Sequence, residues 1–250
     1  MKITPHAQTP VTTSRRALLR ASVATAALST AAGSALIGGA GPAGAVTRTP
    51  ISRTKRPSTP AAALAELSVG NRRWRTFKQQ HPNESRAVRQ ELVSGQVPFA
   101  LILGCIDSRV PPELVFDQGL GDLMTVRSAG EVLDEAVLGS VAYGVLELGI
   151  PLVLVLGHQS CGAVSAAVHA EETGEPLPAH IQYIADQIKP AIDHSQEGDA
   201  RVDATVSAQA ELVRSRLAGE PDLAAKVATG ELEIAAARYE LNTQLVHRVS

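Results

Sequence analysis

Two unbroken apolar runs mark the chain. Residues 99–103 read Phe-Ala-Leu-Ile-Leu, residues 152–156 read Leu-Val-Leu-Val-Leu, and a glycine follows each run. Apolar runs of this length, without alternating polar positions, are typical of strands buried on both faces of a sheet. A shorter apolar stretch at 123–126 predicts a third strand between them.

Helical spacing organises most of the other apolar positions. In residues 61–80, Leu64, Leu67, Trp74 and Phe77 form one apolar stripe, which predicts one or two helices. Similar patterns predict helices at 134–148, 162–171, 180–192 and 203–217, and a final strand or hairpin from 232–238, a turn at 240–243 and 244–249. Because strands alternate with helices, we expect an α/β fold with a mainly parallel sheet flanked by helices.

The first 45 residues have the pattern of an export signal. Arg15, Arg16 and Arg20 precede a weakly apolar, Ala-rich stretch at 21–37, and small residues at 43–45 form a candidate cleavage site. The paired arginines resemble the twin-arginine type of bacterial signal. Since the apolar stretch is short and contains Ser, Thr and Gly, we expect cleavage and no stable membrane anchor. The sequence therefore predicts a protein exported to the periplasm or the medium.

Length and charge limit the remaining part of the chain. The 250 residues leave room for one domain of ordinary to large size after a signal at 1–45 and a polar linker at 46–60, so we expect the catalytic domain at 61–250. The formal net charge is −2, with 23 basic and 25 acidic residues. A chain without an extended basic field is a poor ligand for nucleic acid, which we exclude as a partner.

The only two cysteines, Cys105 and Cys161, lie just beyond the two long apolar runs. They are open to three interpretations: one disulfide, two inert buried thiols, or metal ligands. His158 shares the second loop with Cys161, and Asp107 shares the first loop with Cys105. Because the carboxyl ends of parallel strands meet at one edge of a sheet, we expect these four side chains to converge. A disulfide alone would need neither the histidine nor the aspartate.

Two thiolates, an imidazole and a carboxylate or water form a tetrahedral donor set that suits Zn²⁺. Asp107 is the exchangeable member of this set, because carboxylates hold zinc less firmly than thiolates. Arg109 stands two residues after Asp107 and competes with the metal for its carboxylate. We therefore expect one zinc ion per chain, with Asp107 either on the metal or paired with Arg109.

The motif Cys105-x-Asp107-x-Arg109 followed by His158-x-x-Cys161 resembles the paired signature of β-carbonic anhydrases. The resemblance extends over residues 61–249 and includes the surrounding segments 110–113, 117–119 and 121–123. It implies that Cys105, His158 and Cys161 bind zinc, with Asp107 as fourth ligand or as partner of Arg109. It further implies that Gln96 hydrogen-bonds substrate and that Tyr143 lines the pocket.

The resemblance also implies an activity and an assembly. The expected reaction is the reversible hydration of carbon dioxide to bicarbonate and a proton by a zinc-bound hydroxide, with Asp107 accepting a hydrogen bond from it. The expected assembly is a homodimer or a higher homo-oligomer, in which N-terminal helices pack on the neighbouring subunit. Ser128 and Glu131 depart from the family pattern, and a charged Glu131 facing the site would repel bicarbonate and hydroxide.

Three other functions fit part of the pattern. A hydrolase of carbonyl sulfide or carbon disulfide would use the same scaffold and metal. A non-enzymatic zinc-binding protein would keep the metal permanently four-coordinate. A thiol redox protein would use the two cysteines but would leave His158, Asp107 and Arg109 unexplained.

Overall fold

The computed structural model describes residues 56–249. The predicted export signal and most of the predicted linker, up to residue 55, lie outside the described residues. The last five linker residues are described, and the fold begins within them: Thr59 accepts a hydrogen bond from the Ala62 N–H and caps a helix that starts at Pro60.

A mainly parallel sheet forms the centre of the described domain. Within residues 56–249 it has five strands in the order β2-β1-β3-β4-β5. The first four strands run parallel, and β5 pairs antiparallel with β4. The strands are β1 (Ala100–Gly104), β2 (Leu123–Arg127), β3 (Leu152–His158), β4 (Glu233–Tyr239) and β5 (Val246–Arg248). The predicted α/β class and parallel sheet are confirmed, and the predicted final hairpin corresponds to β4 and β5.

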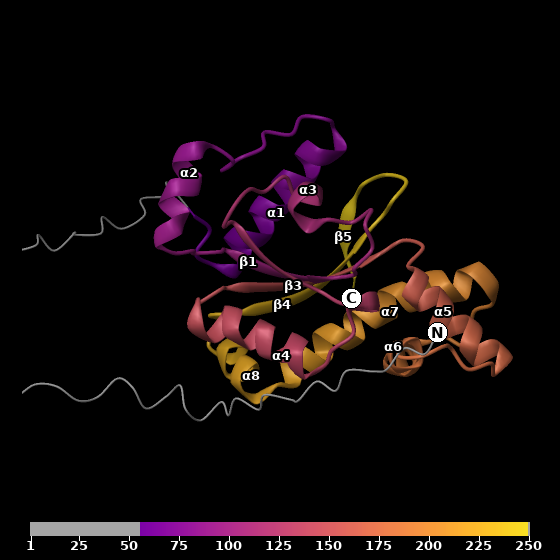
Figure 1. Cartoon of the computed structure of the whole chain (residues 1–250). Coiled ribbons are helices and arrows are strands. Elements are labelled where there is room, and N and C mark those ends of the chain that lie inside the picture. Colours follow the sequence, from indigo (N-terminus) through magenta and orange to yellow (C-terminus); the bar gives the residue numbers. More distant parts are fainter. Residues whose placement is uncertain (1–55, 250) are drawn as a thin grey trace, which may run out of the picture. The chain divides into compact units, whose positions relative to one another are not determined.

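Helices cover both faces of this sheet (Figure 1). One face carries α1 (Pro60–Arg75), α2 (Arg86–Glu91) and α3 (Pro112–Val115), whereas the other carries α4 (Glu135–Ala142), α7 (Gly198–Gly219) and α8 (Pro221–Ala228). The helices α5 (Gly162–Thr173) and α6 (Ile181–Ile188) follow β3. Short helical turns complete the set: η1 (Leu92–Ser94), η2 (Ala129–Glu131), η3 (Tyr143–Glu147) and η4 (Lys189–Ala191). In the described range, no helix combines the length and the apolarity needed to cross a bilayer.

Alternate residues of the central strands supply two separate cores. Leu101 and Leu103 of β1 pack with α4 and α7, whereas Ile102 of β1 packs with Leu67 of α1 and with Phe116. This alternation follows from the two-residue period of a strand, and it explains why the runs at 99–103 and 152–156 contain no polar position.

The helix α1 is fastened to the carboxyl-terminal hairpin. Asn71, which is 3% exposed, donates to the carbonyls of Val115 (3.1 Å) and Gln244 (2.9 Å) and accepts from the Val246 N–H (3.0 Å). Because α1 thus packs on its own sheet, it is a structural part of its own domain. The next helix, α2, buries no residue against the described part of the chain.

Candidate metal centre

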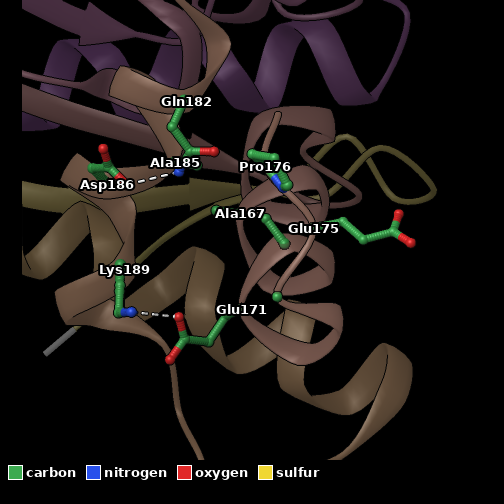
Figure 2. Close-up of a pocket in the computed structure, with 10 residues that line it drawn as sticks. Ala167, Glu171, Glu175, Pro176, Gln182, Ala185, Asp186 and Lys189 are labelled. Carbon is green, nitrogen blue, oxygen red and sulfur yellow. Dashed lines mark hydrogen bonds and ion pairs between the residues drawn. The ribbon is translucent and has the colours of Figure 1, made fainter. Parts of the chain in front are cut away.

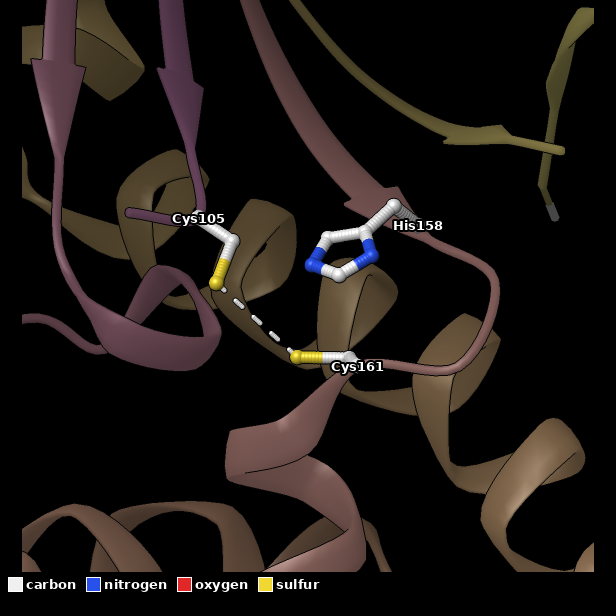
Figure 3. Close-up of side chains that lie close together, drawn as sticks. All are labelled: Cys105, His158 and Cys161. Carbon is white, nitrogen blue, oxygen red and sulfur yellow. Dashed lines mark hydrogen bonds between the residues drawn. The ribbon is translucent and has the colours of Figure 1, made fainter. Parts of the chain in front are cut away.

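Three side chains from two strand ends converge on one point (Figure 3). Cys105 directly follows β1, His158 is the last residue of β3, and Cys161 is the N-cap of α5. One ligand atom from each residue lies within 4.8 Å of the other two, and all three residues are buried. The parallel pairing of β1 with β3 brings these loops to the same edge of the sheet.

The distances fit a metal better than a disulfide. The two sulfur atoms are 3.9 Å apart, and both cysteines are free thiols. Two thiolates on a tetrahedral zinc, each with a Zn–S bond of ~2.3 Å, would be about 3.8 Å apart, whereas a disulfide bond is ~2.05 Å long. The sulfur atoms therefore have the separation of metal ligands.

The histidine supports the same conclusion. His158 is fully buried, and its Nε2 has no hydrogen-bond partner in the described residues. Its Nδ1 lies 3.0 Å from the carbonyl oxygen of Gln159, so a proton on Nδ1 leaves a lone pair on Nε2. A buried nitrogen that carries a lone pair beside two sulfur atoms completes a donor set suited to zinc.

The two cysteine side chains influence each other through the contact between their sulfur atoms. Hydrogen bonding from Cys161 lowers the pKa of Cys105 against the opposing effect of burial, and His158 and the Gly130 N–H, 3.4 Å from the sulfur, lower it further. The same interaction with Cys105, together with burial, raises the pKa of Cys161. A buried cluster that holds a thiolate favours a cation among its ligands.

Asp107 is paired with Arg109 and stands outside the ligand group. Its Oδ1 accepts from Arg109 Nε (2.9 Å), and its Oδ2 accepts from Arg109 Nη2 (2.7 Å). The Oδ2 atom is 3.9 Å from His158 Nε2. The hydrogen bond from Arg109 lowers the pKa of Asp107 to about 2, although burial opposes this shift. The carboxylate is therefore charged throughout the neutral range and positioned beside the cluster.

An apolar hollow of about 450 Å³ opens next to Cys105 and Asp107. Its walls are mostly alkyl side chains from η2, α5, α6 and the loop between the last two, among them Ala129, Ala163, Leu177, Ile181 and Ile184. An uncharged, apolar substrate would gain from leaving water for this surface.

In the structure, Gln96 and Tyr143 lie away from the three candidate metal ligands. Gln96 is exposed and precedes β1, whereas Cys105 follows it, so the five-residue strand separates them by roughly 17 Å. Tyr143 is 50% exposed and begins η3, whose Gly144 approaches Leu101 and Ile150 near the amino ends of the strands. Within one chain, neither residue reaches the hollow, because both stand at the opposite end of the sheet.

The burial of Glu131 changes the expectation that this residue adds negative charge to the site. It is 1% exposed, and its Oε1 has no hydrogen-bond partner in the described range. Burial raises the pKa of its carboxyl well above the ordinary value, and the charge of Cys105 adds to the rise. Burial therefore disfavours the charged form of this carboxyl, and Glu131 does not line the apolar hollow beside Cys105.

A second hollow, of about 460 Å³, lies between α5 and α6 (Figure 2). Its lining includes Glu171 and Lys189, which form an ion pair at 2.7 Å. None of the three candidate ligands lines it, so it is separate from the metal centre.

The sequence analysis did not identify Arg127 as a residue near the metal centre. In the structure, Arg127 contacts the loop that holds Cys105 and Asp107.

Comparison with known proteins places the chain among one group of enzymes. A family model described as carbonic anhydrase matches residues 100–246. The protein named carbonic anhydrase 2 of Mycobacterium tuberculosis is 41% identical over 189 residues, which are 74% of this chain and 91% of that protein.

Solved structures agree on the fold. The β-carbonic anhydrase CafA of Aspergillus fumigatus has a TM-score of 0.61 and 22% identity, with 76% of this chain and 90% of that chain covered. A tetrameric β-carbonic anhydrase of Sordaria macrospora has a TM-score of 0.60 and 18% identity, with 74% of this chain and 95% of that chain covered. At these identities the two structures establish the shared fold alone.

Proposed function

The chain belongs to the β-carbonic anhydrase family, and from this membership we infer that it catalyses the reversible hydration of carbon dioxide to bicarbonate and a proton. The observation that carries this function is the cluster of Cys105, His158 and Cys161 beside an ion-paired aspartate and an apolar hollow. We assign one zinc ion per chain to the three ligands.

Zinc held at this cluster supplies the Lewis acidity that activates water for attack on carbon dioxide near neutral pH. Residues around the metal ligands orient the reacting water. Asp107, kept charged by Arg109, accepts a hydrogen bond from the attacking water through its Oδ2 and so directs the water's lone pair. The apolar walls of the hollow accept carbon dioxide and bind the charged product less well, which favours release of bicarbonate.

Substitutions of the aspartate–arginine pair test this function. Asp107→Asn should keep about one zinc per chain, since three ligands remain, yet lose most of the hydration activity, roughly 100-fold, because the amide neither pairs with Arg109 nor accepts in the same way. Arg109→Ala should lower activity more than Arg109→Lys, and lysine should remain impaired because it lacks the planar fork. The measurements are metal content and stopped-flow hydration from pH 6 to 9.

The outcomes separate the alternatives. Near-normal turnover of Asp107→Asn, or full activity of Arg109→Ala across this range, would contradict the assigned roles. Assays with carbonyl sulfide and carbon disulfide alongside carbon dioxide identify the preferred gas.

We propose further that the protein is exported by the twin-arginine route. Arg15 and Arg16 ahead of the Ala-rich stretch at 21–37 support this proposal. Replacement of both arginines by lysine should leave the precursor in the cytoplasm, as detected by fractionation and immunoblotting. Unchanged export of the doubly substituted protein would contradict the route.

We also propose that the enzyme is a homodimer or a higher homo-oligomer. Exposed apolar side chains on the face that carries α1 and α2 support an interface there, because Phe77 is 82% exposed and Val93 is 88% exposed. Light scattering of the purified enzyme gives the mass, and a monomer at micromolar concentration would count against this assembly.

A further inference from the structure

Arg127 links the end of one strand to the loop that carries the site. It is the last residue of the edge strand β2 and pairs in register with Gly104 of β1, the residue before Cys105. Its Nε donates to the Cys105 carbonyl at 2.8 Å, and its Nη2 donates to the Asp107 carbonyl at 2.6 Å. A longer contact from Nη2 reaches the Val110 carbonyl at 3.5 Å.

The loop needs such a support. Residues 105–111 connect β1 to α3 outside any helix or strand. Apart from a turn in which the Val110 N–H donates to the Asp107 carbonyl (3.1 Å), no helix or sheet ladder fixes the peptide planes that aim the Asp107 carboxylate. The ion pair of Asp107 with Arg109 joins two side chains of the same loop, so the pair by itself does not tie the loop to the sheet. The guanidinium of Arg127 instead holds the backbone on both sides of Ile106.

We propose that Arg127 is a positioning residue that orients the Asp107–Arg109 pair against the metal centre. It acts through two carbonyl oxygens and does not line the apolar hollow beside Cys105. The planar fork spans both acceptors at once, which a single ammonium group does not reproduce. This inference rests on the proposed carbon dioxide hydration.

The first test compares two arginines at the ends of the two edge strands. Arg127→Ala and Arg127→Lys should each lower kcat by about 10- to 100-fold, with KM within about two-fold, because misplacement by roughly 1 Å has effects of this size. Arg248→Ala is the matched control, since Arg248 ends β5 and pairs only with Glu233 (2.9 Å) among the described residues. It should keep wild-type kcat. Wild-type kcat in Arg127→Ala, or full recovery with lysine, would overturn the proposal.

The second test asks whether Arg127 acts through Asp107. In the Asp107→Asn background, Arg127→Ala should cause little further loss of kcat, whereas a general structural role predicts that the two losses multiply. Multiplicative losses would therefore overturn the proposal.

A third measurement does not depend on turnover. The visible spectrum of the cobalt(II)-loaded protein should change in Arg127→Ala and Arg127→Lys at a constant metal content of about one per chain, and it should match wild type in Arg248→Ala. An unchanged spectrum in both Arg127 variants would contradict the positioning role. If the wild-type protein binds metal but hydrates no carbon dioxide, the proposed function fails, while the spectra still decide the role of Arg127.

Discussion

Glu131 combines three features that are uncommon in one residue. It is buried, one of its carboxyl oxygens has no hydrogen-bond partner in residues 56–249, and its backbone has a positive φ of 54°. Gly130, just before it, has a φ of 64°, and its carbonyl accepts a hydrogen bond from the buried Gln209 at 3.0 Å. The strained turn therefore keeps a carboxyl group inside the protein, next to the metal centre.

This burial makes stability depend on pH in a predictable direction. The folded protein raises the pKa of Glu131 well above the ordinary 4.5, so the folded state retains a proton that the unfolded chain releases above that value. The contribution to stability is fully present below about pH 4.5 and is lost as pH rises towards the folded pKa. Removal of the Glu131 carboxyl group should therefore stabilise the folded protein most at high pH.

We predict that Glu131→Gln raises the melting temperature by about 3–6 °C at pH 8.5, for a penalty of roughly 1–2 kcal/mol. The effect should be much smaller at pH 4.5, where the unfolded chain still keeps much of the proton. Thermal unfolding of the zinc-loaded protein at both pH values measures this difference. Glu147→Gln is the control, because Glu147 is exposed, and it should leave both melting temperatures unchanged. An equal shift of Glu131→Gln at both pH values would contradict the buried neutral carboxyl.

At the scale of the elements, α1 approaches its neighbour so closely at Gly70 that no side chain fits there. A Cβ atom at Gly70 would lie 1.7 Å from the carbonyl oxygen of Phe116, which follows α3. That oxygen belongs to the backbone and does not swing aside, so only glycine lets the two segments approach. In contrast, Gly139 of α4 is exposed, and a Cβ atom there meets nothing within 4 Å.

These two glycines provide a matched pair of substitutions. Gly70→Ala should destabilise the protein by about 3 kcal/mol or more, because the overlap must be relieved by movement of α1. Gly139→Ala should stabilise it by about 0.5–1 kcal/mol, because alanine restricts the unfolded chain and favours the helix. Urea denaturation followed by circular dichroism measures both values. A Gly70→Ala protein as stable as wild type would contradict the packing of α1 on this segment.

The same elements show what the sequence predicts and where it fails. The buried strands and most helices follow from periodicity, because that signal is local. The prediction of one apolar stripe over 61–80 is wrong at Phe77, which is 82% exposed. The helix ends at Arg75, and Asp117 binds the N–H groups of Gln80 and His81 beyond it. Such a distant contact has no signature within the segment.

The residues of the candidate site also fall into those that the sequence predicts and those that it does not. Cys105, His158 and Cys161 are predictable because each stands at the end of a recognisable strand or the start of a helix. The contact of Arg127 with the Cys105 loop depends on the register of β2 against β1, which periodicity does not specify. Gln96 matches a position of the family pattern in the sequence. Its distance from the three ligands, however, depends on the direction of β1, which separates Gln96 from Cys105.

At the scale of the described domain, the pairing of β1 with β3 brings the metal ligands together. The ligands extend from β1 and β3, whose residues pair directly from Leu101 with Val153 to Gly104 with Leu156. Two cores, one on each face, pack against these strands without a ligand side chain, whereas a third cluster around α5 and α6 includes Cys105 and Cys161. Because the two cores on the sheet contain no ligand, we expect zinc to add stability to a fold that forms without it, in contrast to small zinc domains that unfold when the metal is removed.

Removal of the metal tests whether the fold forms without zinc. Extraction of zinc with a chelator should leave the far-ultraviolet circular dichroism nearly unchanged but lower the melting temperature by about 8–16 °C, since a ligand at 1,000 times its Kd stabilises by ~4 kcal/mol. Thiol titration of the unfolded, zinc-free protein should find both Cys105 and Cys161 reactive. Cys105→Ser, which removes one ligand, should melt near the zinc-free value with or without added zinc. Collapse of the circular dichroism on chelation would mean that the metal builds the fold, and a melting temperature insensitive to chelation would mean that the cluster holds no metal.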